Sequence, residues 1–297
     1  MILLMNEMLQ LYPKNFDQYE LIDAGGFEKL ERFGNLITRR PEPQAAWSKA
    51  LPESEWEKLT QAYFKKEKNN PDKGEWLLRK GIAPNWTINY AYKDMTLSFK
   101  LGFSSFKHVG IFPEQADNWD FIYDQCKKIK NPKILNIFAY TGGASLAARA
   151  AGADVTHVDS IKQTISWAND NMQLSELHNI RWVVEDAFKF VQREVRRGAK
   201  YNGIILDPPS YGRGPNGEKW ILEEKINELT QLCSQLLVPD NSFLVFNLYS
   251  MGFSAMVIES LVKCHFPKNS KTAIGELFLP DRAGRKLPLG TFLRIEV

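Results

Sequence analysis

Apolar runs and amphipathic stretches alternate regularly from residue 132 to the C-terminus. Short apolar runs predict buried strands at residues 133–138, 154–159, 180–185, 201–207 and 242–249. Apolar residues at helical spacing predict helices between them, at residues 142–152, 161–175, 186–198 and 223–239, before a last helix and two further strands. Strands separated by helices of this length indicate right-handed βαβ crossovers, so we expect an α/β fold with a parallel, doubly wound sheet.

The pattern before residue 100 is different. Short strand-like stretches are separated by Gly25 and Gly26, which predict a hairpin whose turn needs positive φ. Strand-like alternation resumes over residues 86–101. We therefore expect two domains, a small β-rich and barrel-like domain with one helix over residues 1–100 and the sheet domain over residues 101–297.

The helix expected in the first domain falls within residues 46–66. Ser54 is its candidate N-cap, and Glu57 three residues later completes a capping box. The polar residues 65–75 that follow predict an exposed loop.

Composition and charge exclude several classes of protein. Of the 297 residues, 44% are hydrophobic and 25% charged, as in globular proteins, and the net charge of +3 permits a nucleic-acid partner without requiring one. Cys126, Cys233 and Cys264 form no CxxC pair, so we expect buried, reduced thiols and no metal site. No apolar run approaches membrane-spanning length and the first fifteen residues contain no basic leader, so we expect a cytoplasmic protein.

Ligands of such a sheet bind beyond the carboxyl ends of its strands, so the residues that follow each strand are the candidates. Gly142 and Gly143 follow the first strand, where they let the backbone approach a ligand or only allow close packing. Asp159 ends the second strand, where a carboxylate can accept hydrogen bonds from a ribose diol, although a solvated aspartate is common there. Glu185 and Asp186 end the third strand and can face an adenine edge, or Asp186 caps the next helix.

The fourth strand runs into Asp207-Pro208-Pro209-Ser210-Tyr211. Two consecutive prolines neither continue a strand nor enter a helix without a break, so they hold their carbonyls in fixed directions. With the acceptor Asp207 beside them, such a rim can hold a planar amino or imino group in line with an electrophile. An ordinary tight turn needs neither the carboxylate nor the aromatic ring.

Four motifs, ILNIFAYTGG, HVDS, EDAF and DPPSYGRG, together resemble the class I S-adenosylmethionine-dependent methyltransferases. The resemblance is to the bacterial branch that is similar to large-subunit ribosomal RNA methyltransferases, and it covers about residues 100–297. Two further segments, RRPEPQAAW and HVGIFPEQADNW, are similar to a subgroup of that branch. The family implies a Rossmann-like sheet of seven strands with an antiparallel last strand, a small β-rich domain before it, and S-adenosyl-L-methionine as the cofactor.

The resemblance also implies roles for individual residues. It places Asp159 at the ribose, Asp186 and Ala187 at the adenine, and the methionine part of the cofactor in a loop formed by Asn136, Phe138, Ala139, Tyr140, Thr141 and Gly142. It implies Gly143, Ser160 and Asp207 as further contacts with the cofactor. The segment from His108 to Gln115 is similar to one that closes over the cofactor, which makes Gln115 and Phe112 contacts. It places methyl transfer at Asp207, Pro208, Pro209 and Tyr211.

The residues also indicate which type of methyl transfer is expected. Transfer to nitrogen or oxygen needs mainly alignment of the nucleophile and exclusion of water, whereas transfer to C5 of a pyrimidine needs a cysteine thiolate. The motifs DPPSYGRG and FNLYSMG, which follow the fourth and fifth strands, contain no cysteine, and Cys233 lies inside a predicted helix. We therefore expect methyl transfer that is not of the cysteine-dependent C5 type.

The substrate is expected to be a base of ribosomal or other RNA. In the loop of residues 212–220, Arg213 and Lys219 suit phosphates, while Tyr211 or Trp220 suits stacking on an exposed base. The alternative is a solvated loop with Trp220 packed on its own domain. By analogy, the β-rich domain of residues 1–100 is expected to bind the RNA and residues 101–297 to form the catalytic domain.

Other functions are weighed against this one. An NAD-dependent dehydrogenase would have a GxGxxG turn, which this chain lacks. A non-catalytic RNA-binding module that keeps the cofactor pocket, and a methyltransferase for proteins or small molecules, stay open as alternatives. The sequence does not indicate an oligomeric state.

Overall fold

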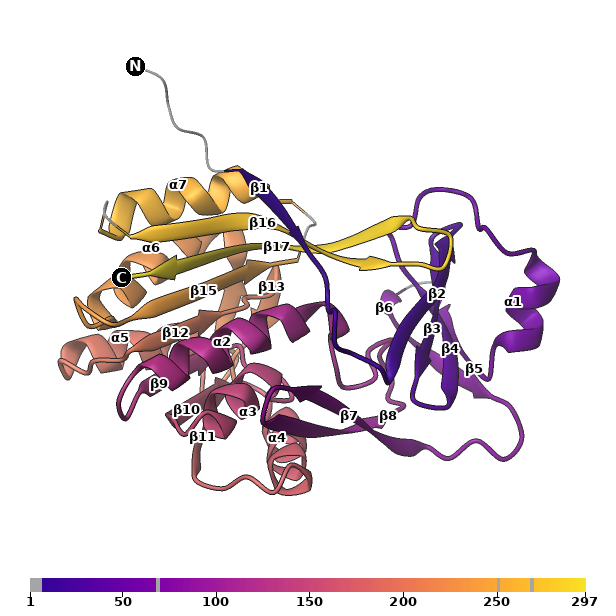
Figure 1. Ribbon diagram of the computed structural model, residues 1–297, viewed down its shortest axis with the longest axis horizontal. Helices are drawn as coiled ribbons and strands as arrows, with labels where there is room; N and C mark the ends of the chain where they lie inside the picture. Colours follow the sequence, from indigo (N-terminus) through magenta and orange to yellow (C-terminus); the bar gives the residue numbers. More distant parts are fainter. Residues whose placement is uncertain (1–6, 68–69, 250–251, 268–269) are drawn as a thin grey trace, which may run out of the picture. The chain divides into compact units, whose positions relative to one another are not determined.

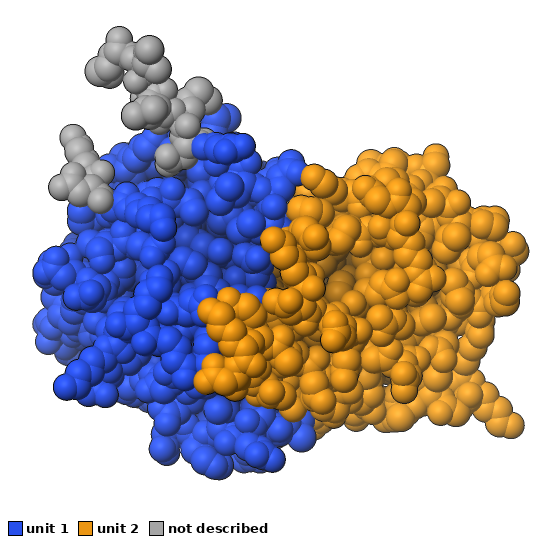
Figure 2. Space-filling view, viewed as in Figure 1, with its two compact units in different colours: residues 1–11, 117–277, 290–297 blue, residues 12–116, 278–289 orange. Residues whose placement is uncertain are grey.

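The computed structural model describes residues 7–67, 70–249, 252–267 and 270–297. The chain forms two compact units (Figure 2): unit 1 comprises Met1–Leu11, Asp117–Leu277 and Gly290–Val297, and unit 2 comprises Tyr12–Ala116 and Phe278–Leu289. The boundary expected after residue 100 falls within unit 2. The functional roles assigned to residues 1–100 and 101–297 stay predictions.

Unit 1 is built on an eight-stranded sheet of described residues with the order β1-β16-β17-β15-β12-β9-β10-β11 (Figure 1). The strands are β1 (Met8–Leu11), β9 (Lys133–Ile137), β10 (Asp154–Asp159), β11 (Ile180–Val184), β12 (Gly203–Leu206), β15 (Phe243–Leu248), β16 (Lys271–Pro280) and β17 (Lys286–Glu296). β9, β10, β11, β12 and β15 pair in parallel, and β17 pairs antiparallel with β15. The predicted seven strands and the antiparallel last strand are confirmed, and β1 adds an eighth strand parallel to β16.

The helices of the sheet domain lie where the apolar periodicity predicts them. They are α3 (Gly143–Ala150), α4 (Lys162–Leu174), α5 (Ala187–Arg196), α6 (Leu222–Leu236) and α7 (Ala255–His265). An additional helix, α2 (Ala116–Lys128), was not expected, although Trp119, Ile122, Tyr123 and Cys126 are buried at helical spacing within it. No helix in the described part of the chain is long and apolar enough to cross a membrane.

Unit 2 contains a five-stranded sheet with the order β2-β3-β4-β5-β6 and a separate hairpin. Its elements are β2 (Tyr19–Gly25), β3 (Glu28–Phe33), β4 (Leu36–Pro41), α1 (Glu53–Leu59), β5 (Ala62–Glu67), β6 (Asn70–Leu78), β7 (Asn85–Tyr92), β8 (Met95–Gly102) and the 3-10 turn η1 (Pro113–Gln115). The β-rich front domain is confirmed. The turn after β2 has Gly26 at φ 60°, as the glycine pair predicted.

Two details predicted for this region are wrong. Helix α1 is much shorter than residues 46–66, and it begins after Pro52 with no side-chain cap, so Ser54 and Glu57 form no capping box because Ser54 already lies in the first turn. The predicted exposed loop over residues 65–75 is replaced by strand where the structure describes it: residues 65–67 belong to β5 and residues 70–75 to β6, an antiparallel pair, and residues 68–69 lie outside the described residues.

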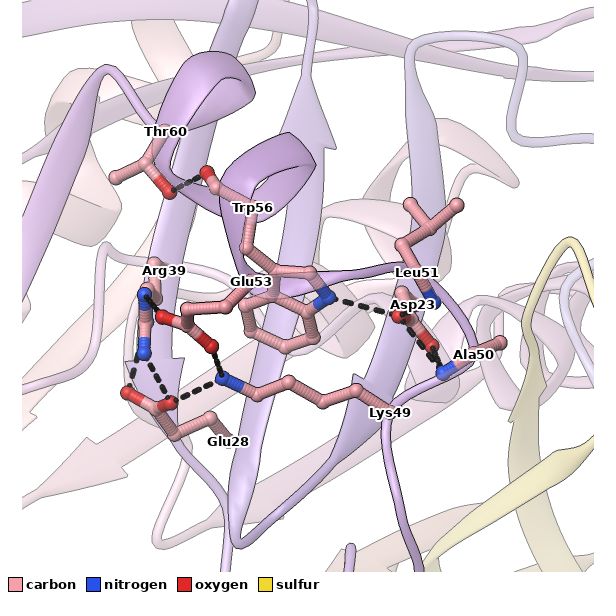
Figure 3. Close-up of polar contacts among 9 residues, drawn as sticks. All are labelled: Asp23, Glu28, Arg39, Lys49, Ala50, Leu51, Glu53, Trp56 and Thr60. Carbon is pink, nitrogen blue, oxygen red and sulfur yellow. Dashed lines mark hydrogen bonds and ion pairs between the residues drawn. The ribbon is translucent and has the colours of Figure 1, made fainter.

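A buried carboxylate ties α1 to the sheet of unit 2 (Figure 3). Asp23 on β2 accepts hydrogen bonds from Nε1 of Trp56 at 2.7 Å and from the backbone N–H of Leu51 at 2.8 Å. The guanidinium of Arg285 also donates to Asp23 and pairs with Asp281. These partners satisfy a charge that would otherwise be costly to bury.

A second charged group lies on the other side of the Trp56 ring (Figure 3). Glu28 pairs with Arg39 at 2.6 Å and with Lys49 at 2.8 Å, and both cations also pair with Glu53 of α1. Nζ of Lys49 lies 4.0 Å from the centre of the Trp56 ring. The tryptophan is thus held by an acceptor at its N–H and by a cation over its face.

Candidate functional site

The loop that joins β9 to α3 has an unusual backbone. Phe138 and Tyr140 have φ values of 57° and 50°, and Gly142 has φ 94° at the N-cap of α3. Positive φ is uncommon for residues other than glycine, and such positions cluster at binding sites, where the surrounding structure holds them. The chain thus maintains a tight loop at the carboxyl end of the central strand.

Asp159 at the end of β10 holds this loop. Its Oδ2 accepts the backbone N–H of Tyr140 at 3.0 Å, and its Oδ1 accepts the backbone N–H of Ile161 at 2.9 Å. Burial raises the pKa of Asp159, and the hydrogen bonds from the backbone oppose that rise. Each carboxylate oxygen has two lone pairs, so Asp159 can still accept hydrogen bonds from a diol.

A buried polar chain supports the same loop from behind. Asn136 donates to Oγ of Ser145 at 2.9 Å, and Oγ lies 3.0 Å from Nδ1 of His157. Burial lowers the pKa of His157 to about 3, so the ring is neutral at physiological pH. Asn171 donates to the carbonyl of Thr141 at 2.9 Å. Asn136 therefore has a role within the fold, and its contact with a cofactor stays a prediction.

The glycine pair has a packing role as well. A Cβ atom on Gly143 would lie 2.6 Å from the Trp119 ring, and one on Gly142 would lie 3.3 Å from Cβ of Ala168. The alternative role for glycine, close packing, is therefore confirmed at Gly143. Its contact with a cofactor stays a prediction, as do those of Ala139 and Ser160.

Asp186 caps α5, because its Oδ1 accepts the backbone N–H of Lys189 at 2.9 Å. The capping alternative is thus confirmed, and it is compatible with an adenine next to Asp186 and Ala187. Glu185 pairs with Arg193, with 2.6 Å between Oε2 and Nη2.

At the end of β12, the carboxylate of Asp207 is partly buried. Its Oδ1 accepts a hydrogen bond from Nδ2 of Asn247 at 2.9 Å. Burial raises the pKa of Asp207 to about 6, and the bond from Asn247 acts in the opposite direction. Pro208 is buried and Pro209 is exposed, and the carbonyl of Pro209 accepts Nε1 of Trp220 at 2.7 Å.

The segment after this turn is a hairpin rather than the expected loop. β13 (Tyr211–Arg213) and β14 (Lys219–Ile221) pair antiparallel. Trp220 is only 2% exposed and packs on Phe138 with 4.9 Å between ring centres, so it is not a platform for an RNA base. Tyr211 is 52% exposed and suits that role.

The structure brings most of the predicted residues together in unit 1. Gln115 and Phe112 belong to unit 2, and their contacts with a cofactor stay predictions. Sequence reasoning missed Asn247 and His157. The signal for Asn247 was a polar residue inside the apolar run of residues 242–249, on the strand next to Asp207.

The cysteines differ from the expectation at one position. Cys126 and Cys233 are buried, but Cys264 is exposed because it lies on the solvent side of α7. Burial raises the pKa of the Cys126 and Cys233 thiols, which keeps both protonated and weakly nucleophilic.

A family model for S-adenosylmethionine-dependent methyltransferases matches residues 51–262. The chain belongs to this family. The crystal structure of a SAM dependent methyltransferase from Agrobacterium tumefaciens is 35% identical, with a TM-score of 0.89, and the match covers 97% of this chain and 93% of that one. The Rossmann-like fold and the cofactor of the family are thus confirmed, and the dehydrogenase alternative is not supported.

Curated relatives resemble only part of the chain. Ribosomal RNA large subunit methyltransferase K/L of Shewanella frigidimarina is 30% identical over 167 residues, which are 55% of this chain and 22% of that protein. Ribosomal RNA large subunit methyltransferase I of Aeromonas salmonicida is 27% identical over 142 residues, which are 47% of this chain and 35% of that protein. The chain therefore spans well under half the length of these relatives.

Proposed function

We propose that this chain transfers the methyl group of S-adenosylmethionine to a base of ribosomal or other RNA in the cytoplasm, without a cysteine nucleophile. The observation that carries the proposal is the carboxylate of Asp207, held by Asn247 at the end of β12 beside two prolines. The names of the relatives, ribosomal RNA large subunit methyltransferases, support an RNA substrate.

The chemistry of the residues at the strand ends fits the cofactor. Asp159 is an acceptor for the ribose hydroxyls, and the tight loop of residues 138–142 leads into the N-terminus of α3, which suits the carboxylate of the methionine part. Asp186 and Ala187 border the adenine. The cofactor supplies an electrophilic methyl group.

The residues of the chain then align the acceptor. Asp207 accepts a hydrogen bond from an amino group of the base, and Pro208 and Pro209 fix the direction of the neighbouring carbonyls. Tyr211 at the exposed rim stacks on the base. Both buried thiols lie inside α2 and α6 rather than in the segments after β12 and β15, where a C5 transfer would need a cysteine.

Unit 2 contributes the grip on RNA in this proposal. Its strands β5 and β6 and the segment after them present the exposed cations Lys65, Lys66, Lys73, Arg79 and Lys80. Cations of this kind suit the phosphate backbone of RNA.

The deciding experiment is transfer of a labelled methyl group to total RNA from a strain that lacks this gene, followed by nucleoside mass spectrometry. One methylated nucleoside is expected with the native protein and none with Asp207→Ala, which should still bind the cofactor in calorimetry. Label in protein or small molecules but not in RNA would refute the RNA substrate. Cofactor binding without transfer to any fraction would favour the non-catalytic module.

A further inference from the structure

Asn247 and Asp207 are neighbours because of the register of two parallel strands. β12 and β15 pair Ile205 with Val245 and Leu206 with Phe246, so the next position on each strand is Asp207 or Asn247. Asn247 is 3% exposed, and its Nδ2 donates to Oδ1 of Asp207 at 2.9 Å. The central sheet therefore fixes this contact, and it does not depend on a loop.

The other end of the Asn247 amide is unusual. Its Oδ1 is buried and has no hydrogen-bond partner among the described residues. A buried acceptor without a partner is rare in native proteins. The amide thus presents its donor to Asp207 while its own acceptor stays unsatisfied. This orientation suits an ionised carboxylate, which only accepts hydrogen bonds, whereas a protonated Asp207 would supply an O–H that the unsatisfied amide oxygen could accept.

Two influences act on the charge of Asp207 among the described residues. Burial favours the neutral form of Asp207, and the hydrogen bond from Asn247 favours the charged form. Within the described ranges, no charged side chain adds to these two influences on Asp207. In the described part of the chain, the amide of Asn247 is therefore the group that favours the charged form against burial.

We propose that Asn247 is a positioning residue for methyl transfer: it keeps Asp207 ionised at neutral pH and holds Oδ1, so that Oδ2 accepts the amino group of the substrate. This inference rests on the proposed function. Asn247 itself does not touch the reacting atoms, and it acts through the carboxylate.

Two variants that lack the donor test the proposal. Asn247→Leu has a similar shape and adds apolar contact, whereas Asn247→Ala leaves room for water. Leu248→Val is the matched control, because it perturbs the next buried position of β15 and leaves the amide in place. The pKa of Asp207 is measured by carbon NMR on protein with labelled aspartate, with the resonance assigned from its loss in Asp207→Asn.

Both Asn247 variants should raise the pKa of Asp207 by about one unit or more, the scale of a hydrogen bond to a charged group. Methyl transfer should then fall about fivefold at pH 6 and return to the native rate near pH 8.5, since a higher pH restores the ionised carboxylate. Leu248→Val should change neither the pKa nor the shape of the pH profile. Recovery at high pH separates this role from a general loss of structure.

Three results would overturn the proposal: an unchanged pKa of Asp207, a rise in Asn247→Leu alone, which would indicate desolvation, or a rate that stays low at every pH. Should the native protein methylate no RNA, the proposed function fails. The NMR titration still decides the role of Asn247 in that case, because it needs no substrate.

Discussion

The backbone N–H of Tyr140 donates to Oδ2 of Asp159 across 3.0 Å, which joins the loop after β9 to the end of β10. Tyr140 has positive φ, so this bond stabilises a backbone conformation that a tyrosine rarely adopts. Asp159 therefore both shapes the cofactor loop and, in the proposed function, binds the ribose.

Asp159→Ala should weaken S-adenosylmethionine binding by roughly 1–3 kcal/mol, the range for leaving buried hydrogen-bonding groups unpaired. Calorimetry gives the affinity. Asp154→Ala is the matched control, because Asp154 is exposed at the opposite end of the same strand and should leave the affinity unchanged. An equal affinity of Asp159→Ala and the native protein would disprove the ribose role.

Asp207 makes the stability of the protein depend on pH. Its pKa in the folded state, about 6, lies above the ordinary value of 3.8, so the folded state favours the protonated form. Its contribution to stability is therefore full below about pH 4 and is lost as the pH rises through 6. Asp207→Asn should raise the free energy of unfolding at pH 8 by about 1–2 kcal/mol, and the gain should shrink towards pH 5.

Thermal or urea unfolding at pH 8 and at pH 5 measures the difference in the free energy of unfolding between Asp207→Asn and the native protein. Glu218→Gln is the control of opposite sign, because hydrogen bonds, first of all from Lys189, lower the pKa of that partly buried carboxylate to about 2. Glu218→Gln should not raise the free energy of unfolding at pH 8. A constant difference between Asp207→Asn and the native protein at both pH values would show that Asp207 is not perturbed.

The strand ends of unit 1 could be read from the sequence because each strand is an apolar run that stops at a polar residue. Asp159, Asp186 and Asp207 were located in this way. Asn247 was not, because it lies within a run and its importance depends on the register between β12 and β15. Pairing between strands far apart in the chain is a tertiary property that local periodicity does not encode.

Local patterns failed where packing or backbone geometry decided the outcome. Trp220 follows a polar, glycine-containing stretch, which indicates exposure, yet its ring is buried on Phe138 because a hairpin turns it inwards. The capping box at Ser54 had the right residue types, but Pro52 sets the start of α1 two residues earlier.

Gly143→Ala should destabilise unit 1, because the new Cβ would lie 2.6 Å from the Trp119 ring, well inside contact distance. We expect a loss of roughly 1–3 kcal/mol in the free energy of unfolding, typical of overpacking. Gly212→Ala is the control, since its Cβ would meet neighbours no closer than 3.7 Å. A partner change, Trp119→Phe, should recover part of the loss; equal effects of the two alanine variants would contradict the packing role.

Asp23→Ala should destabilise unit 2 more than the loss of a surface ion pair would. Asp23 is 1% exposed and accepts Trp56, the backbone of Leu51 and Arg285, so its removal leaves buried donors without an acceptor. We expect a loss of about 3–5 kcal/mol in urea unfolding followed by Trp fluorescence. Glu20→Ala, which breaks more exposed pairs with Arg282, should cost only about 0–1 kcal/mol. Similar losses for the two variants would mean that the acceptor role of Asp23 contributes little, and that packing around Trp56 alone holds α1 on the sheet.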